Sequence, residues 1–425
     1  MSHGHHHHAS AGLPWARRLT VLLLAVVGLV TVAGMALLWP RDTPEVESTP
    51  STRVLGSVVS VTSAACPEEA PAGTACGSVA VRLDDGSSVT AEIPNGPGAP
   101  AVGPGDKVTL LVLDDGAGGP RTYSIADYQR GTSLWILGAV FALAVVAFGR
   151  WRGLTALLGL GITFAVLLLF IVPAILDGRS PVLVAVVGAA FIMLTVLYLT
   201  HGLTATTTVA VAGTLASLTL TAGLSALAIA FTHLSGIGDE TATYLNITEG
   251  DVNMRGLLLA GIVIGSLGVL DDVTVTQSAT VSELALANPA YGFRRLYGAA
   301  TRIGRAHIAS VINTIVLAYA GASLPLMLLF RTSGTPAGEL LTGEMIAQEL
   351  VRSAVGTIGL IAAVPITTAL AAFIAARTQV VAPASSAPSA AEPPVAGRGP
   401  DRPPVSAPRP PGEDPWQSFY ERDHR

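Results

Sequence analysis

The amino-acid sequence predicts a mainly α-helical membrane protein: a polytopic bundle of about eight transmembrane helices with a small extracytoplasmic β-barrel domain. Half of the 425 residues are hydrophobic and 12% are charged, whereas soluble domains carry about 25% charged residues. Much of the chain consists of apolar runs long enough to cross a hydrocarbon core of about 30 Å. Residues 40–130 differ, because prolines, glycine turns and alternating β-branched residues replace those runs.

Residues 1–18 form the predicted cytoplasmic N-terminus, and residues 19–39 form the predicted first transmembrane helix. Arg17 and Arg18 precede the apolar run, so the positive-inside rule keeps them in the cytoplasm. The same order is also typical of a signal peptide, but the run suits a full span and no clean cleavage site follows it. A histidine-rich start is either a weak Zn²⁺ or Ni²⁺ site or similar to an expression tag: His3, His5, His6, His7 and His8.

The β domain, residues 40–130, is expected outside the cytoplasm. Short strands are predicted over residues 53–62, 78–83, 88–93 and 107–113, and Asp85-Gly86 is a hairpin signal between two of them. Short strands joined by glycine turns favour a small closed barrel, which we expect to be OB-like.

The chain has two cysteines, Cys66 and Cys76, and both fall in this outer domain. A disulfide between them suits an oxidising compartment and would contribute about 3 kcal/mol by the loop-entropy argument. Two free thiols are the alternative.

Residues 131–376 are predicted to form a seven-helix transmembrane domain. Its spans are expected at residues 132–149, 153–176, 181–200, 203–231, 256–287, 307–330 and 351–376. Arginines concentrate in the turn at residues 150–152, in the stretch 288–306 and after residue 377, whereas most acids fall in the alternate loops. The positive-inside rule therefore places both termini in the cytoplasm. Residues 377–425 form a proline-rich, disordered cytoplasmic tail.

The candidate site lies within the span at residues 256–287. An acid at the bilayer centre costs about 2.5–3.5 kcal/mol, so two adjacent acids need a partner, a proton or a cation. Hydroxyl and carboxylate oxygens are hard ligands that suit a cation or a proton relay. The alternative is that the acids only cap a helix or pair with arginine. The candidate residues for ion or proton binding are Asp271, Asp272, Thr276, Gln277 and Glu283.

The next span offers candidate pairing or gating residues. His307 lies at the predicted membrane boundary, where it could pair with Asp271 or Asp272, or could simply be an interfacial histidine. Asn313 needs a hydrogen-bond partner within the span, and contact between helices is its favoured role. Arg302 and Arg305 complete this group and are available to pair with the acids.

Several function classes find no support in the sequence. We find no Walker loop, dinucleotide fingerprint, nucleophile elbow or zinc-protease motif, so we expect neither an ATP-driven pump nor a soluble-type enzyme, and no cofactor. The net charge of -5 is small and spread out, so we expect no nucleic-acid partner. The expected partners are the lipid bilayer and a small ion or solute, and the oligomeric state is left open.

A set of short motifs indicates a family when taken together. They are Tyr123 to Tyr128, His201-Gly202, Gly213-Thr214, Gly268 to Gln277, Gly304 to Ile308, Asn313 to Pro325, Gly356 to Gly359 and Val364 to Ala369. With them, residues 53–376 resemble the YibE/F family of multi-spanning bacterial membrane proteins. The resemblance implies a bacterial cytoplasmic membrane and eight or so helices, and it implies no particular substrate.

We therefore expect a secondary transporter of an inorganic ion or small solute that uses intramembrane carboxylates. The alternative is a non-transporting membrane scaffold or sensor that acts through its β domain. A third hypothesis is an intramembrane enzyme acting on lipid. The paired acids and a nearby histidine would permit it, but no recognised catalytic motif supports it.

Overall fold

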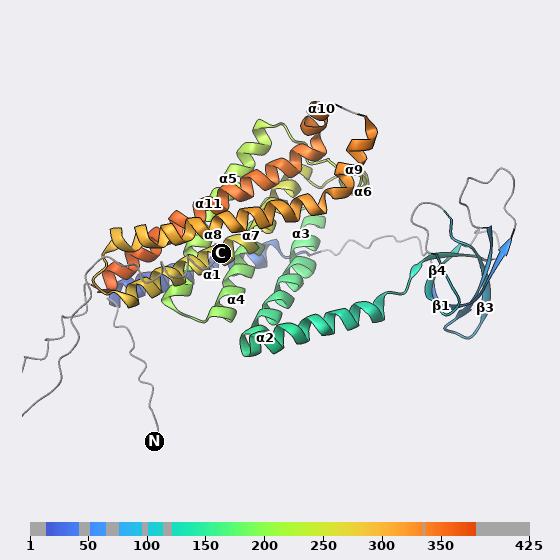
Figure 1. Cartoon of the computed structure of the whole chain (residues 1–425), viewed down its shortest axis with the longest axis horizontal. Helices are drawn as coiled ribbons and strands as arrows, with labels where there is room; N and C mark the ends of the chain where they lie inside the picture. The colour runs from blue at the N-terminus through green and yellow to red at the C-terminus, as the bar shows by residue number, and fades with distance from the viewer. Residues whose placement is uncertain are drawn as a thin grey trace, which may run out of the picture. The chain divides into compact units, whose positions relative to one another are not determined.

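The computed structural model describes residues 14–41, 52–64, 76–95, 101–113, 121–334 and 336–379. These residues form a five-stranded β-barrel and a set of mostly long helices, as Figure 1 shows. The predicted tail beyond residue 379 and the histidine-rich start lie outside the described residues.

The barrel is built from β1 (Thr52–Ala64), β2 (Cys76–Leu83), β3 (Ser88–Glu92), β4 (Lys107–Leu113) and β5 (Thr122–Tyr128). Its closed strand order is β1-β2-β3-β5-β4, and the β3–β5 pair is parallel while the other pairs are antiparallel. Alternate residues point inward, so that Val79, Val81, Val108 and Leu110 are fully buried. The four predicted strands are present, whereas β5 was not among the strands predicted from the sequence.

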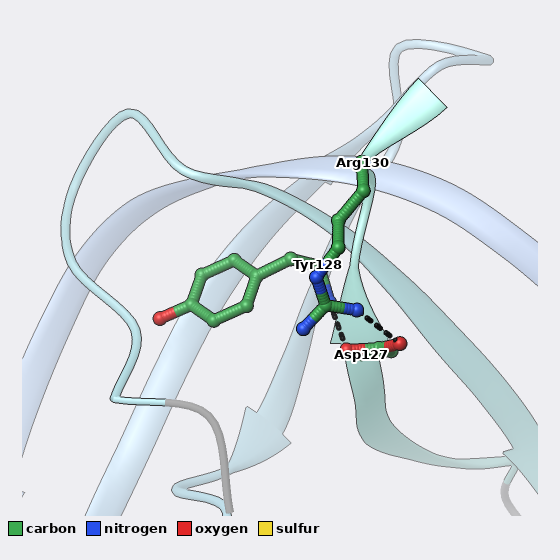
Figure 2. Close-up of polar contacts among 3 residues, drawn as sticks. All are labelled: Asp127, Tyr128 and Arg130. Carbon is green, nitrogen blue, oxygen red and sulfur yellow. Dashed lines mark hydrogen bonds and ion pairs between the residues drawn. The ribbon is translucent and has the colours of Figure 1, made fainter. Parts of the chain in front are cut away.

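Side-chain hydrogen bonds hold the residues that follow β5 to the barrel. The Gln129 side chain donates hydrogen bonds to Val108 O at 2.8 Å and to Gly56 O at 3.3 Å. The Arg130 guanidinium donates a hydrogen bond to Asp127 Oδ2 at 2.6 Å and lies beside the Tyr128 ring (Figure 2). The hydrogen bond from Arg130, followed by one from the Tyr128 N–H, lowers the pKa of Asp127. Gln129 and Arg130, the two residues between β5 and α2, are therefore bound to the barrel.

That helix, α2 (Gly131–Val166), continues through a π-helical turn, η1 (Leu167–Ile171), into α3 (Val172–Leu176). It bends sharply at Arg150, whose φ of 52° and ψ of -126° are not helical. The bend brings the Gly153 backbone against the Val145 carbonyl, where a Cβ would not fit. The predicted turn between the spans 132–149 and 153–176 is therefore present, and Figure 1 shows its two arms.

The remaining helices are α1 (Pro14–Leu38), α4 (Pro181–His201), α5 (Ala205–Phe231), α6 (Glu240–Thr248), α7 (Met254–Ala287), α8 (Phe293–Ala322), α9 (Leu324–Ser333), α10 (Ala337–Thr342) and α11 (Glu344–Gln379). Side-chain caps fix several of their starts: Thr204 accepts from Thr207 N for α5, and Asn253 accepts from Gly256 N for α7. Helix α1 packs on α4, with Gly34 against Val187, and Trp39, which follows α1, stacks on Phe170 of η1.

Six helices in the described residues are long and apolar enough to cross a membrane. The predicted count of about eight is not confirmed. The segment Gly131–Leu176 counts once despite its bend, and α1 is not among the six. The chain is thus a multi-pass membrane protein with a small β-barrel.

The predicted length of the connection between α7 and α8 was wrong. Residues 288–306 were expected to form a cytoplasmic loop, but the connection ends at Gly292 and α8 begins at Phe293. The predicted span 307–330 is also divided, because α8 ends before Ser323 and α9 follows it. The arginines of this stretch lie on the exposed face of an amphipathic helix whose other face buries Leu296, Ala300, Gly304 and Ile308.

Candidate intramembrane polar site

Helix α7 is the central helix of the bundle, because it packs against α4, α5, α8 and α11. Its buried positions include the apolar Leu267, Leu270 and Val273 and also three polar residues. These three, Thr274, Gln277 and Ser278, are fully buried. The predicted acids lie within the same stretch, so α7 carries the candidate site.

Asp271 and Asp272 do not share a surface. Successive residues of a helix point about 100° apart, since 3.6 residues make a turn. Asp271 is half-buried, and its Oδ1 is a buried atom with no hydrogen-bond partner among the described residues. Asp272 is exposed on the next face of α7. The two carboxylates that the sequence places side by side therefore face different surroundings.

A buried hydroxyl pair joins α5 to α7 beside this point. Thr214 Oγ1 and Thr274 Oγ1 lie 2.6 Å apart, and both residues are fully buried. Each hydroxyl also contacts a backbone carbonyl of its own helix, Ala210 O at 3.0 Å for Thr214 and Asp271 O at 3.1 Å for Thr274. The bilayer interior offers no water to satisfy such groups, so this pairing links the helices.

Gln277 connects α7 to α8 and α11. Its Oε1 accepts a hydrogen bond from Thr368 Oγ1 at 3.0 Å, whereas its Nε2 is buried without a partner among the described residues. The side chain lies against Gly304, where an added Cβ would come within 2.7 Å of Nε2. Gln277 is therefore fixed at its Oε1, and its amide donors have no acceptor among the described residues.

The open face of α7 carries the other predicted residues. Asp272 and Glu283 are exposed and Thr276 is half-buried. Gly261, Gly265 and Gly268 lie on this same face, and a Cβ built on any of them meets no atom within 4 Å. We call the five exposed residues Gly261, Gly265, Gly268, Asp272 and Glu283 the open face of α7.

Helix α8 carries the predicted pairing residues, but the predicted pairs are not formed. Arg302, Arg305 and Asn313 are exposed, and the Nε2 of half-buried His307 is a buried atom without a partner among the described residues. The ion pairs in the described part of the chain join Arg130 to Asp127, Arg179 to Asp177 and Arg352 to Glu349.

Comparison with known proteins gives the family. The family model described as YibE/F-like protein matches residues 137–377, which is more than half of the chain. The chain belongs to the YibE/F-like family. No curated protein and no solved structure matches it.

The family match covers the bundle from the first arm of α2 to α11, and so includes every polar residue of α7 and α8 described above. It begins after the barrel, so the motif Tyr123 to Tyr128 lies outside it. Membership in the YibE/F-like family thus supports the bundle and its polar helices, and leaves the role of the barrel open.

The sequence reading missed one charged residue of the bundle. Arg352 borders a cavity of about 40 Å³ between α7, α8 and α11, which Ser266, Tyr319 and Thr357 also line. Its Nη1 pairs with Glu349 at 3.0 Å, while its Nε is buried without a partner among the described residues. In the sequence, Arg352 stands just inside the predicted span 351–376, where an arginine is typical of the membrane interface.

Most of the predicted metal and disulfide residues lie outside the described part of the chain. His3, His5, His6, His7, His8 and Cys66 are outside the described residues, whereas Cys76 is disulfide-bonded. Within the described ranges, no three His, Cys, Asp or Glu side chains gather as a metal site. The polar chemistry of the described bundle therefore rests on α7 and its neighbours.

Proposed function

We propose that this protein is a secondary transporter of an inorganic ion or another small solute, with Asp271 as its proton- or cation-binding group. One observation carries the proposal: the buried, unpartnered Oδ1 of Asp271 within a membrane-spanning helix. An intramembrane carboxylate without a protein partner is costly unless it holds a proton or a cation, and such residues commonly mark ion pathways.

The surroundings of Asp271 support this role. The hydroxyl pair Thr214–Thr274 lies one turn further along α7, whereas the unpartnered amide donors of Gln277 face α8 and α11. Hydroxyl and carboxylate oxygens can replace part of the hydration shell of a small cation. Thr276, which is half-buried at the edge of the open face of α7, would line the approach.

The proposed membrane topology has eight spans with both termini in the cytoplasm and the barrel outside. The spans are α1, the two arms of α2 to α3, α4, α5, α7, α8 and α11. Arg150 and Arg152 at the bend, and Arg294 and Arg295 at the start of α8, would then face the cytoplasm. This placement follows the positive-inside rule for a bacterial cytoplasmic membrane.

The test compares cells that lack the protein with cells that carry the wild type, Asp271→Asn, Asp272→Asn or the control Asp251→Asn. Asparagine keeps the size of the side chain and removes its charge and its titrating proton. Cellular content of metals and inorganic anions is measured by elemental analysis, with membrane insertion checked by fractionation. We expect wild type and Asp251→Asn to restore the content of one element, and Asp271→Asn to leave it as in the deletion strain.

Two results would contradict the transport proposal. Full restoration by an inserted Asp271→Asn protein would exclude the carboxylate as the coupling group. An unchanged content of every element in the deletion strain would favour a scaffold or sensor instead. The closed barrel, a five-stranded form that often binds ligands, is the observation that favours this second candidate.

A further inference from the structure

The open face of α7 is not suited to contact lipid. Asp272 and Glu283 are exposed on it, and carboxylates are unfavourable against hydrocarbon. Gly261 and Gly265 on this face form a small-xxx-small pattern, which allows another helix to approach closely. The face therefore has the form of a contact surface that lacks its partner among the described residues of a single chain.

The outer face of α8 presents the complementary chemistry. Arg302, Ala309 and Asn313 are exposed on the side of α8 opposite to buried Gly304 and Ile308. Asn313 lies in the middle of an apolar stretch, where its amide needs a hydrogen-bond partner. This outer face offers an amide and a guanidinium to a surface that carries two carboxylates.

The contacts within one chain fix the relative depth of these residues in the membrane. Helices α7 and α8 form a hairpin in which Gly304 meets Gln277, and Ile315 and Tyr319 share a cavity with Ser266 and Ile262. This antiparallel register puts Gly268 level with Asn313. A two-fold axis along the membrane normal preserves depth, so the α8 of one copy would meet the α7 of another at these same levels.

Two pairs of complementary side chains agree with a single docking register. Asn313 lies about one turn from the level of Asp272, and Arg302 lies about one turn from the level of Glu283, in the same direction. Side chains lean toward the N-terminus of their own helix, and the two helices are antiparallel, so the members of each pair lean toward each other. The same offset in both pairs is what one rigid contact would require.

We propose that a second copy of this chain docks the outer face of its α8 on the open face of α7, and that the contact is reciprocal about a two-fold axis. Asn313 of one copy donates to Asp272 of the other, and Arg302 of one copy pairs with Glu283 of the other. The three glycines admit the close approach of the helix. This pairing goes beyond the proposed transport function and does not depend on it.

Cysteine cross-linking in native membranes tests the contact. One copy of the full chain carries Gly265→Cys with one epitope tag, and a co-expressed copy carries Leu317→Cys with another tag. Leu317 is 62% exposed and lies near the level of Gly265, and the test leaves all four polar partners intact. We expect oxidation to produce a disulfide-linked species that carries both tags. Chains without an introduced cysteine give the background.

Two cysteine positions serve as controls. Ile315→Cys lies near the same level of α8 but is half-buried against its own bundle, at the cavity that Gly265 also borders, and Leu137→Cys is exposed on the first arm of α2. Neither should form the two-tag species with Gly265→Cys. Equal cross-linking through Leu137→Cys would show random collision and overturn the proposal, as would the absence of a two-tag species with Leu317→Cys.

A second variant tests the polar pair. Adding Asn313→Leu to the Leu317→Cys copy should lower the cross-linking yield by about tenfold, because the carboxylate of Asp272 loses its donor. Thr314→Leu is the matched control, since the exposed Thr314 hydroxyl bonds the Ser310 carbonyl of its own helix. An unchanged yield with Asn313→Leu, or an equal loss with Thr314→Leu, would contradict the Asn313–Asp272 contact.

Discussion

Gly304 holds the position where the backbone of α8 meets the side chain of Gln277. A Cβ there would lie within 2.7 Å of both Gln277 Nε2 and Val364 Cγ1. Both residues are buried, and Gln277 is tied to Thr368, so neither can move away freely. The absence of a side chain at one residue therefore keeps the helices α7, α8 and α11 in contact around the buried amide.

Gly304→Ala should destabilise the bundle by about 1–3 kcal/mol, because the added methyl group overpacks a close contact. Thermal unfolding of the detergent-solubilised protein, followed by tryptophan fluorescence, measures this as a lower midpoint.

Gly321→Ala is the matched control on α8, because an added Cβ there meets no atom within 4 Å. It should leave stability unchanged or raise it by up to about 1 kcal/mol through helix propensity. Equal midpoints for the two alanine variants would mean that Gln277 is not held against α8.

Among the secondary-structure elements, α2 carries the strongest backbone constraint. Arg150 adopts a positive φ at the bend, a conformation that disfavours any side chain and suits glycine. Neighbouring Arg152 is in regular helix on the other side of the bend.

Arg150→Gly should therefore be more stable than Arg150→Ala by about 1–2 kcal/mol. Both variants lose the same charge, so their difference isolates the backbone term. At Arg152 the order should reverse, with alanine favoured by about 1 kcal/mol over glycine. The thermal unfolding midpoints of the four variants test this prediction. The same order of stability for glycine and alanine at both positions would argue against the bend at Arg150.

Most elements could be predicted from the sequence, because long apolar runs and alternating strands leave strong local signals. The start of α8 could not be placed, since Arg294, Arg295 and Arg302 lower the mean hydropathy of a helix that buries Leu296 and Ala300 on one side. The candidate site was predictable in composition but not in arrangement. Which hydroxyl meets Thr274 depends on how α5 packs on α7, a tertiary fact that no local pattern contains.

For the whole molecule, the arrangement of the chain across the membrane is the property on which the other proposals depend. Ser87→Cys lies in the β2–β3 turn of the barrel, and Ala290→Cys lies between α7 and α8; both residues are exposed. A membrane-impermeant maleimide added to spheroplasts should label Ser87→Cys at once and Ala290→Cys after lysis, because the proposed topology puts them on opposite sides. Labelling of both before lysis, or in the reverse order, would refute that topology.

The hydroxyl-rich core has a consequence for how the chain is made. Thr214, Thr221 and Ser225 each donate to a carbonyl one turn back in α5. That helix can therefore leave the translocon with these hydroxyls already satisfied, before any neighbour arrives. Helix α7 has no such provision for the Oδ1 of Asp271 or the Nε2 of Gln277. We therefore expect the insertion of α7 into lipid to be less favourable than that of α5, which ties the cost of biogenesis to the polar groups of one helix.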